Sequence, residues 1–488
     1  MRDSIRFLLG DQATELRCFN PTLTVLDWLR TQARRPGCKE GCNEGDCGAC
    51  TVVVARSEAG RLRYRSVNAC IQFLGALDGC QLLTVEDLQA PGNALHAVQH
   101  AMVEQHGSQC GFCTPGFIMS LFAMAKSEPE APSDQKIDDI LAGNLCRCTG
   151  YAPIVRAAKQ IYVSERGDRF DQREAETVAR LSALHDEETI HVEYQDRLFI
   201  APASSDELAA TLLEHPAATI LAGSTDVGLW VTKQMRPLDT IVWIGRVHEL
   251  REIQDSAEGL EIGAAVTYAE AVESIAALYP DFAELVRRLG SAQIQNVGTI
   301  GGNIANGSPI GDSSPALIAM GAVLHLRRGH ERRATQLEDF FLGYGRQDRS
   351  PGEFIERIFV PRPPLGARYR AYKVSKRFDQ DISAVMGAFL LRLVGERVVE
   401  ITIAFGGMAA IPQRARTAEA SLREQIWNEA SVHKAQQAME EDFQPISDMR
   451  ASGRYRMRVA KNLLMRLYLE TTSTVETRLV GDRTLAHA

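Results

Sequence analysis

The apolar positions at the start of the chain recur with the period of two that predicts β-strands. Residues 5–9 form the first such run, and residues 15–19 return as its hairpin partner after a Gly-Asp turn. A helix with three apolar residues on one face opens at residues 20–22, and an apolar strand follows at residues 51–54. The first part of the chain therefore predicts a small domain of mixed strands and helix.

After this domain the apolar period changes to that of a helix. Residues 95–103 show helical spacing. Thr114 predicts an N-cap and Pro115 a first helical residue before the apolar residues 117–122. A further helix carries Pro153 in its first turn. This stretch predicts a helical domain.

Strands and helices alternate in the middle of the chain. Residues 164–191 are dense in Arg, Asp and Glu and predict a solvated linker with room for a helix. Strands follow at residues 199–200 and 219–221, and Ser204 with Glu207 predicts a capping box for the helix between them.

The last third, from about Arg368, reads as an α+β domain. Residues 384–393 and 398–405 are apolar runs of strand length, and amphipathic helices fit within residues 419–439 and 455–469. Elements of both kinds in one stretch indicate a sheet covered by helices.

Length and charge narrow the class of protein. At 488 residues the chain is long enough for three or four domains. Its 54 Lys and Arg residues against 62 Asp and Glu give a net charge of −8, which predicts no binding of nucleic acid or of an anionic membrane. The N-terminus lacks the continuous apolar region of a signal peptide, and no later stretch approaches a bilayer span, so we expect a cytoplasmic protein.

The cysteines point to metal or redox chemistry. All but Cys18 of the 11 cysteines fall between Cys38 and Cys148, and in a reducing compartment they favour metal or redox chemistry over a disulfide framework. Cys38 offers a competing ligand register with Cys42. We expect Cys18, Cys38 and Cys80 to be small apolar fillers, because free cysteine is commonly buried for packing.

The densest cysteine group lies in a glycine-rich loop at residues 41–50. Cys42, Cys47 and Cys50 have the C-x4-C-x2-C spacing of plant-type [2Fe–2S] ligation, and Cys70 is a suitable distant fourth ligand. The glycines let backbone N–H groups approach the cluster sulfurs, and some of these positions need positive φ. Metal-free thiols and structural zinc are alternatives, although zinc ribbons pair two C-x2-C knuckles and Cys70 has no such neighbour.

A second group of four cysteines lies just before two predicted helices. Cys110 and Cys113 precede the first of these helices, and Cys146 and Cys148 precede the second. Two positive helix ends that face one site favour an anionic tetrathiolate cluster held by these four sulfurs. Zinc could use the same sulfurs, although C-x-C is unusual for a zinc knuckle.

Two stretches of small residues could present backbone N–H groups to phosphate. Residues 222–226 end a strand–helix–strand unit, for which an ordinary tight turn is an equal alternative. Residues 296–312 repeat glycines and amides that leave little side chain to pack, so we expect a ligand backbone to lie against them. No G-x-G-x-x-G follows a strand, which argues against a Rossmann site. Lys373 could reach a phosphate or a cofactor carbonyl, but such a lysine is more often solvated surface.

The cysteine motifs resemble those of the iron–sulfur and FAD half of the molybdenum hydroxylases, in particular the small subunits of bacterial xanthine dehydrogenases. The resemblance rests on residues 41–50, 68–70, 109–116 and 143–151, and it covers almost the whole chain. It implies two [2Fe–2S] centres and leaves Cys38 outside the ligand set. The implied ligands are Cys42, Cys47, Cys50 and Cys70 for one centre, and Cys110, Cys113, Cys146 and Cys148 for the other.

The same resemblance implies a multidomain α+β fold. Its first domain, over residues 1–85, would be a ferredoxin-like β-grasp [2Fe–2S] domain, which also agrees with the order strand, strand, helix, cysteine loop, strand. A helical [2Fe–2S] bundle domain would cover residues 86–163 and a linker residues 164–191. A vanillyl-alcohol-oxidase-type FAD domain over residues 192–367 and an α+β C-terminal flavoprotein domain over residues 368–475 would follow.

Carried over position by position, the resemblance implies a site for FAD and no catalytic residue on this chain. The residues that would meet the pyrophosphate are Leu221, Ala222, Gly223, Ser224, Thr225, Asp226 and Val227. Those that would line or touch the rest of the cofactor are Thr299, Gly302, Asn303, Asp312 and Ile355, with Lys373 near the flavin ring. Eukaryotic relatives carry an aromatic residue against the flavin just before the glycine stretch, where this chain offers only Leu289, so the resemblance does not carry over to the flavin's outer face and its nicotinamide contact.

The implied function is electron transfer within a xanthine dehydrogenase that acts in purine metabolism. A partner would hydroxylate a purine, and the electrons would pass through the two clusters to FAD and then to NAD⁺. No stretch resembles a molybdopterin site, so a molybdopterin-binding large subunit would supply the molybdenum, in a heterotetramer or larger assembly. The alternatives are the iron–sulfur and FAD subunit of another molybdenum hydroxylase, acting on aldehydes or N-heterocycles, and a zinc-stabilised FAD protein. Fusion of both clusters and FAD on one chain favours the first.

Overall fold

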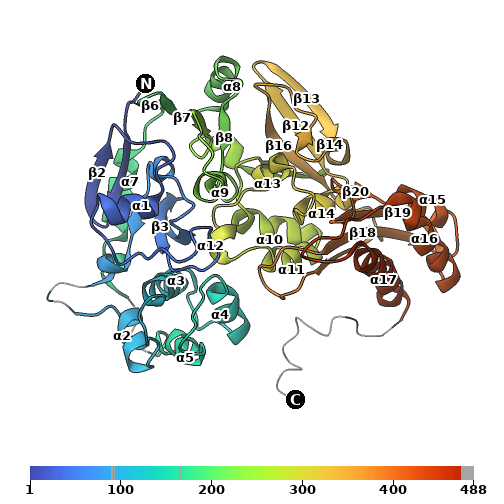
Figure 1. The fold of residues 1–488 in the computed structure, drawn as a ribbon, viewed down its shortest axis with the longest axis horizontal. Helices are drawn as coiled ribbons and strands as arrows, with labels where there is room; N and C mark the ends of the chain where they lie inside the picture. The colour runs from blue at the N-terminus through green and yellow to red at the C-terminus, as the bar shows by residue number, and fades with distance from the viewer. Residues whose placement is uncertain (90–91, 93, 164–166, 474–476, 478–488) are drawn as a thin grey trace. The chain divides into compact units, whose positions relative to one another are not determined.

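The computed structural model describes residues 1–89, 92, 94–163, 167–473 and 477, and it confirms the multidomain α+β class (Figure 1). The chain divides into two units. The first combines Met1–Glu249 with the short segment Gly290–Gly298, and the second combines Leu250–Leu289 with Thr299–Ala488.

The first unit begins with a five-stranded sheet in the order β2-β1-β5-β3-β4. The strands are β1 (Ile5–Leu9), β2 (Gln12–Leu16), β3 (Thr51–Glu58), β4 (Arg61–Asn68) and β5 (Gln81–Leu83), with the helix α1 (Val25–Thr31) and the 3-10 turns η1 (Leu74–Leu77) and η2 (Val85–Leu88) beside them. β1 pairs antiparallel with β2 and parallel with β5, as in a β-grasp.

Two predicted boundaries in this domain are wrong by a few residues. The hairpin partner of β1 is β2 rather than residues 15–19, because Gly10 takes φ 56° and turns the chain at once, so that Leu9 pairs with Gln12. The N-cap of α1 is Thr24, whose hydroxyl accepts from the Asp27 N–H at 3.1 Å.

Four helices form the next domain, in agreement with the predicted helical bundle. They are α2 (Ala97–Glu104), α3 (Thr114–Ser127), α4 (Asp134–Leu141) and α5 (Ala152–Gln160), packed around a common apolar core. Thr114 is the first residue of α3 and not its N-cap, which is Cys113. The Thr114 hydroxyl donates instead to the Ser108 hydroxyl at 2.7 Å.

The predicted linker is more ordered than its composition suggests. Residues 164–166 lie outside the described residues, but α6 (Arg169–Gln172) and α7 (Glu174–Leu184) follow. Leu181 on α7 is buried against Leu8 and Leu62 of the first sheet. The segment therefore packs on the β-grasp domain rather than standing free in solvent.

A four-stranded sheet in the order β6-β7-β9-β8 completes the first unit. Its elements are β6 (Ile190–Tyr194), β7 (Arg197–Ala201), α8 (Ser205–Glu214), β8 (Thr219–Leu221), α9 (Val227–Thr232) and β9 (Thr240–Trp243), followed by the 3-10 turn η4 (His248–Arg251). Only half of the predicted capping box forms on α8, because Glu207 accepts from the Ala203 N–H and not from that of Ser204. The short helix α12 (Ala292–Gln295), from the segment Gly290–Gly298, also belongs to this unit.

The second unit contains an antiparallel sheet in the order β10-β11-β16-β12-β13. The strands are β10 (Ile253–Asp255), β11 (Gly259–Gly263), β12 (Val323–Arg328), β13 (Glu331–Gln336) and β16 (Phe354–Pro361). The helices whose apolar residues share a core with this sheet are α10 (Tyr268–Leu278), α11 (Asp281–Arg287), α13 (Ile300–Asn306) and α14 (Ser313–Met320). The 3-10 turn η5 (Leu337–Asp339) and the hairpin of β14 (Phe341–Gly343) and β15 (Arg346–Gln347) connect β13 to β16.

The C-terminal sheet has the order β17-β18-β19-β20 and is covered by helices, as the sequence predicts. Its elements are β17 (Arg368–Val374), β18 (Val385–Val394), β19 (Arg397–Gly406), β20 (Gln413–Arg414), α15 (Arg416–Leu422), α16 (Glu429–Asp442) and α17 (Gly453–Thr472). Alternate residues of β18 enter two different cores, Met386 toward α14 and Phe389 toward α17. Burial on both faces explains why this strand reads as one apolar run. The end of the predicted domain, residues 474–475, lies outside the described residues.

Candidate functional site

The first cysteine set lies in a loop between α1 and β3 and in the turn after β4. Three of its cysteines come from residues 41–50, and Cys70 follows β4. Gly45 and Gly48 take φ of 77° and 68°. The left-handed backbone at these glycines curls the loop back on itself, as the glycine-rich sequence predicts.

Hydrogen bonds connect the sulfurs of this set to one another. Bonds donated by Cys47 and Cys70 hold the pKa of Cys42 well below its usual range. Bonds with Cys42 and Cys50, together with burial, raise the pKa of Cys70. The N–H groups of Asp46 and Cys47 lie 3.4 and 3.3 Å from the Cys42 sulfur. A curled loop that aims N–H groups at a thiolate is suited to an iron–sulfur cluster, whose sulfurs accept such bonds.

The second cysteine set lies at the starts of α3 and α5. Cys113 is the N-cap of α3, and Cys146 and Cys148 precede α5, whose cap residue Tyr151 takes φ 67°. The Cys148 sulfur lies 3.7 Å from that of Cys110 and 3.8 Å from that of Cys146. Cys113 shares a hydrogen bond with Cys146. The four predicted thiols are thus brought together at two helix N-termini.

The thiols of the second set differ in their tendency to ionise. Burial and the bond with Cys146 raise the pKa of Cys113 to about 12. Burial also acts to raise the pKa of Cys146, but hydrogen bonds from the Thr149 hydroxyl and from nearby N–H groups outweigh it and lower that pKa to about 7. A thiolate is the form that binds a metal, so Cys146 is prepared to act as a ligand.

The other three cysteines have packing roles or none. Cys38 and Cys80 are buried, and Cys38 donates to the Cys50 carbonyl at 3.2 Å. Cys18 is exposed, so the prediction of a buried filler is wrong there, because the residues after β2 lie at the edge of the sheet.

Among the described residues, no group of three or more His, Cys, Asp or Glu side chains is arranged to hold a single metal ion.

The small-residue loop at residues 222–226 follows the carboxyl end of β8 in the first unit. In the described part of the chain, the N–H groups of residues 222–225 donate no hydrogen bond to another backbone group. The Ser224 hydroxyl is buried there without a partner, and Ser224 takes φ 66°. A strained loop with unused donors fits the phosphate group that the sequence predicts.

Gly223 has a packing reason to be glycine as well. A Cβ at this position would lie 1.7 Å from the Val297 carbonyl oxygen. The loop therefore touches the segment Gly290–Gly298, and any larger residue would separate the two. This contact, rather than a ligand, accounts for the glycine.

In the second unit, the structure brings together four of the predicted flavin residues around α13 and the start of α14. The Thr299 hydroxyl caps α13 by accepting from the Gly302 N–H at 2.9 Å. Asn303 accepts from the Ser313 hydroxyl at 2.7 Å. Asp312 lies immediately before α14, whose first residue is Ser313.

Lys373 is buried rather than solvated. Its ammonium group and the Asp312 carboxylate lie 2.5 Å apart, with exposed side-chain fractions of 4% and 6%. The hydroxyl of Ser383 donates to the other oxygen of Asp312. A buried charge pair of this kind costs desolvation, which the attraction between the two charges and the bond from Ser383 act to offset.

Sequence reasoning missed two side chains that hold this pair. Ser383 gives no motif signal, because a single serine before an apolar strand is common. Arg288 donates to the Lys373 carbonyl at 2.8 Å and stacks on the ring of Phe378 at 4.2 Å. Arg288 is only half-buried, and nothing in the sequence around it indicates that it contacts Lys373.

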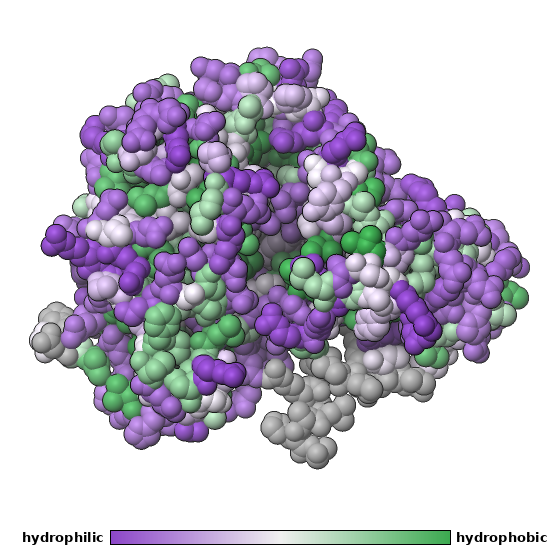
Figure 2. Space-filling model, in the orientation of Figure 1, coloured by the Kyte–Doolittle hydropathy of each residue, from purple (hydrophilic) through white to green (hydrophobic). Residues whose placement is uncertain are grey.

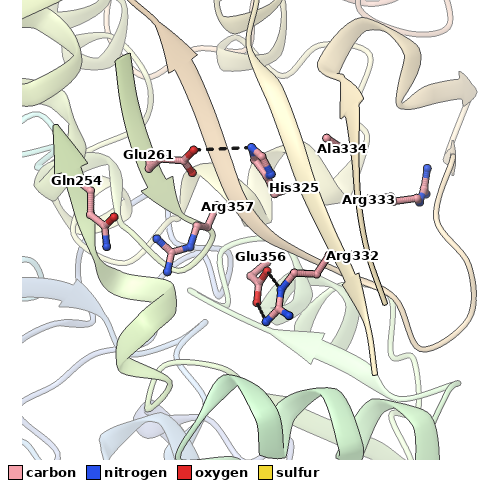
Figure 3. Close-up of a pocket in the computed structure, with 8 residues that line it drawn as sticks. All are labelled: Gln254, Glu261, His325, Arg332, Arg333, Ala334, Glu356 and Arg357. Atoms are coloured by element: carbon pink, nitrogen blue, oxygen red, sulfur yellow. Dashed lines mark hydrogen bonds and ion pairs between the residues drawn. The ribbon is translucent and has the colours of Figure 1, made fainter. Parts of the chain in front are cut away.

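A polar pocket of about 520 Å³ lies on the second unit's antiparallel sheet (Figure 3). Figure 3 shows Arg332 paired with Glu356 and His325 facing Glu261. The nitrogen–oxygen distances are 2.9 Å in the first pair and 3.8 Å in the second. None of the predicted cofactor residues lines it, and Ile355 points instead into the apolar core. The pocket is therefore separate from the predicted flavin residues.

Three family profiles match consecutive parts of the chain. The [2Fe-2S] binding domain matches residues 84–159, the FAD binding domain in molybdopterin dehydrogenase matches residues 192–363, and the CO dehydrogenase flavoprotein C-terminal domain matches residues 370–471. Together they place an iron–sulfur domain, a flavin domain and its C-terminal companion in the order that the sequence predicts.

Named relatives agree with these profiles. Xanthine dehydrogenase of Emericella nidulans is 32% identical over an alignment of 538 positions, which covers 98% of this chain and 39% of the relative. Xanthine dehydrogenase of Drosophila subobscura is 32% identical over 83% of this chain and 34% of its own length. The chain thus spans little more than a third of the curated relatives it matches.

Solved structures resemble about half of this chain. A carbon monoxide dehydrogenase from Hydrogenophaga pseudoflava superposes with a TM-score of 0.53 at 28% identity, over 55% of this chain and 94% of that one. Quinoline 2-oxidoreductase from Pseudomonas putida 86 gives a TM-score of 0.51 at 26% identity over the same shares. The chain belongs to the molybdenum hydroxylases, as an iron–sulfur and FAD-binding part of that family.

The residues present fit the cofactors of this family. Each cysteine set offers four neighbouring sulfurs, one of which, Cys42 or Cys146, has a lowered pKa, and the loop after β8 offers unused donors to a pyrophosphate. Within the described residues, no helix is long and apolar enough to cross a membrane.

Proposed function

We propose that this chain carries electrons from a partner's molybdenum site through two [2Fe–2S] clusters to FAD and then to NAD⁺, in the oxidation of hypoxanthine and xanthine to urate. The observation that carries the proposal is the presence of two complete four-thiol sets within one unit, joined by a hydrogen bond of 2.9 Å from the Leu145 N–H to the Cys47 carbonyl. A redox relay needs two such sites close together, whereas structural zinc does not.

The proposed ligands are the two cysteine sets. The proposed FAD residues are the loop Leu221–Val227 with Thr299, Gly302, Asn303, Asp312, Ile355 and Lys373. Iron–sulfur clusters supply one-electron steps and a flavin converts between one- and two-electron chemistry. The chain itself contributes positioning: N–H groups toward the sulfurs of the first set, and a buried lysine–aspartate pair among the flavin residues.

The surface around the second set supports a partner on that side. Cys110 and Cys148 are exposed, and the neighbouring apolar residues Phe112, Leu145 and Tyr151 have exposed fractions of 48%, 46% and 41%. Figure 2 shows apolar side chains among the polar ones over these helices, at the lower left. Exposed apolar groups that surround reactive thiols suit a protein interface. We propose a molybdopterin-binding subunit as the partner, in a heterotetramer or larger assembly.

Two further functions compete with this one. The likeness to carbon monoxide dehydrogenase and to quinoline 2-oxidoreductase favours a role beside another molybdenum hydroxylase, acting on an aldehyde or an N-heterocycle. A zinc-stabilised FAD protein without a relay is the other. The purine is preferred because the relatives that align over most of this chain are xanthine dehydrogenases.

The purified chain tests the proposal in two steps. Metal analysis should give about four iron and four acid-labile sulfides per chain, and stoichiometric zinc with little iron would remove the relay. NADH should then bleach the flavin and after it the clusters, whereas xanthine should bleach neither until the partner is added. Bleaching by xanthine in the absence of any molybdenum subunit would overturn the division of labour.

The flavin residues have their own test. Gly302→Leu should lose FAD by steric exclusion and keep all iron. Gly343→Leu is the control, because nothing lies within 4 Å of a Cβ there. Retention of FAD by the Gly302 variant would refute the proposed flavin site.

A further inference from the structure

Gln293 is a fully buried polar residue far in sequence from both cysteine sets. It lies on α12, in the segment Gly290–Gly298 that belongs to the first unit although the chain on both sides of it belongs to the second. Its side chain has an exposed fraction of 0%. A buried amide needs a reason, because an unpaired polar group costs on the order of 1–3 kcal/mol.

The amide of Gln293 donates into a network between the two cysteine-bearing domains. Its nitrogen lies 3.1 Å from the Asn144 side-chain oxygen, 3.2 Å from the Ser120 hydroxyl and 3.3 Å from the Thr51 hydroxyl. Ser120 donates to the same Asn144 oxygen at 2.7 Å, and the Asn144 amide donates to Thr51 at 3.2 Å and to the Gly48 carbonyl at 3.1 Å. The Gln293 nitrogen thus donates to groups of both cysteine-bearing domains, while its side-chain oxygen is buried without a partner.

The members of this network adjoin the predicted ligands. Thr51 directly follows Cys50 of the first set, and Asn144 stands two residues before Cys146 of the second. Leu145, between Asn144 and Cys146, makes the hydrogen bond to the Cys47 carbonyl. That bond and the Leu145–Cys146 peptide give a direct route from one set to the other.

The backbone segments in this contact lie so close together that a side chain at any of three glycines would clash. A Cβ at Gly48 would lie 2.1 Å from the Gly143 carbonyl oxygen, and one at Gly116 would lie 2.2 Å from the Gly48 carbonyl oxygen. A Cβ at Gly143 would lie 2.1 Å from the Gln293 side-chain oxygen. Gln293 therefore closes the contact from the side, and loss of its two hydrogen-bond donors would leave the Asn144 and Thr51 oxygens under-satisfied.

We propose that Gln293 is a positioning residue for electron transfer between the two clusters. It fixes the register of the Cys146 loop on the Cys47–Cys50 loop, and with it the hydrogen bond between Leu145 and Cys47. An apolar residue of the same length would fill the space but would not donate to both loops. The inference rests on the proposed two-cluster function and adds to it a residue from outside both cysteine domains.

The experiment uses the whole chain with its clusters. Gln293→Met keeps side-chain length and removes both donors. Gln295→Met is the matched control, since the Gln295 amide donates to the Gly290 carbonyl in its own segment. EPR of the fully reduced protein measures the magnetic interaction between the two clusters, and redox titration of each signal gives its midpoint potential.

We expect Gln293→Met to keep full iron and sulfide but to change the spin–spin splitting and the separation of the two potentials, with the control unchanged. Ser120→Ala should produce a smaller change of the same kind, and it keeps the test open if Gln293→Met does not fold. Splitting and potentials that match the wild type in both variants, at full iron content, would overturn the inference alone. A wild-type chain with a single cluster signal would overturn the relay, and the inference with it.

Discussion

The two cysteine sets offer similar ligands in opposite settings. In the first set, Cys50 and Cys70 have exposed fractions of 1%, whereas in the second set Cys110 and Cys148 lie on the surface. The first is enclosed by a curled loop, and the second is presented at the ends of two helices. Burial and exposure are among the factors that set cluster potentials, so the difference predicts two unequal clusters.

The difference between the two sets also indicates the direction in which electrons would pass between them. The exposed sulfurs of the second set can approach the cofactor of another protein more closely than those of the first set, in which Cys50 and Cys70 are buried and Cys42 and Cys47 half-buried. We infer that the second set faces the partner and that the first passes electrons onward. The predictions that follow test this contrast, beginning with the largest expected effect.

Removal of a ligand should abolish one cluster and spare the other. Cys148→Ala should lose about half of the iron and one EPR signal, and Cys70→Ala should lose the other signal, because each set needs four thiolates. Cys38→Ala is the control and should keep both, since that thiol only donates to the Cys50 carbonyl. Survival of both signals in Cys148→Ala, or loss of one in Cys38→Ala, would refute the ligand assignment.

Separation of the two sets should destabilise the first unit. Gly48→Ala places a methyl group 2.1 Å from the Gly143 carbonyl oxygen at a residue with φ 68°. We expect a loss of about 2–4 kcal/mol in the free energy of unfolding, measured with denaturant while both cluster signals are followed.

Gly60→Ala isolates the part of this effect that comes from backbone strain. Gly60 has φ 76° and nothing within 4 Å of a Cβ, so its variant carries strain without a clash. Equal losses in the two variants would show that the close contact between the sets contributes nothing.

Acid should destabilise the domain of the second cysteine set before the rest of the chain. The expected loss is smaller than that of Gly48→Ala. Burial acts to raise the pKa of Asp168, but hydrogen bonds from His96 on the α2 cap and Lys126 on α3 outweigh it and hold that pKa well below its usual range. A carboxylate whose pKa is lower in the folded than in the unfolded state stabilises the fold at pH values above the unfolded pKa, here 3.8. This contribution is lost as the pH falls below 3.8 toward the folded pKa.

The measurement is the unfolding free energy between about pH 5 and pH 3, followed by the loss of the second cluster's signal. Asp168→Asn should remove a pH-dependent part on the order of 1 kcal/mol. If wild type and variant lose stability in parallel, the carboxylate has no such role.

Short-range patterns predicted most of the fold. The period of two found β1, and the continuous apolar run of β18 was recognised because it is buried on both faces. The errors at β2 and α1 arise where one residue decides a boundary. Gly10 turns the chain earlier than predicted, and the N-cap of α1 is Thr24 and not one of the predicted residues 20–22.

Long-range contacts could not be predicted in the same way. Spacing alone grouped the eight cysteines, because ligands of one cluster recur in short motifs. Lys373 looked like a surface residue, since nothing nearby in sequence reveals that Asp312 lies 2.5 Å away. Gln293 was passed over for the same reason, as its three partners come from residues before 145.

The segment Gly290–Gly298 has a consequence for how the protein is made. Ribosomes release the N-terminal residues first, and domains generally fold in that order during synthesis. The first unit nevertheless needs Gln293 and Val297, which emerge after residues 250–289 of the second. The contacts of these two residues inside the first unit can form only after that later stretch has been released. If iron and sulfide are inserted into the nascent chain, the contact between the two cysteine domains still lacks Gln293 at that time. The nine residues Gly290–Gly298 complete this contact when they are released.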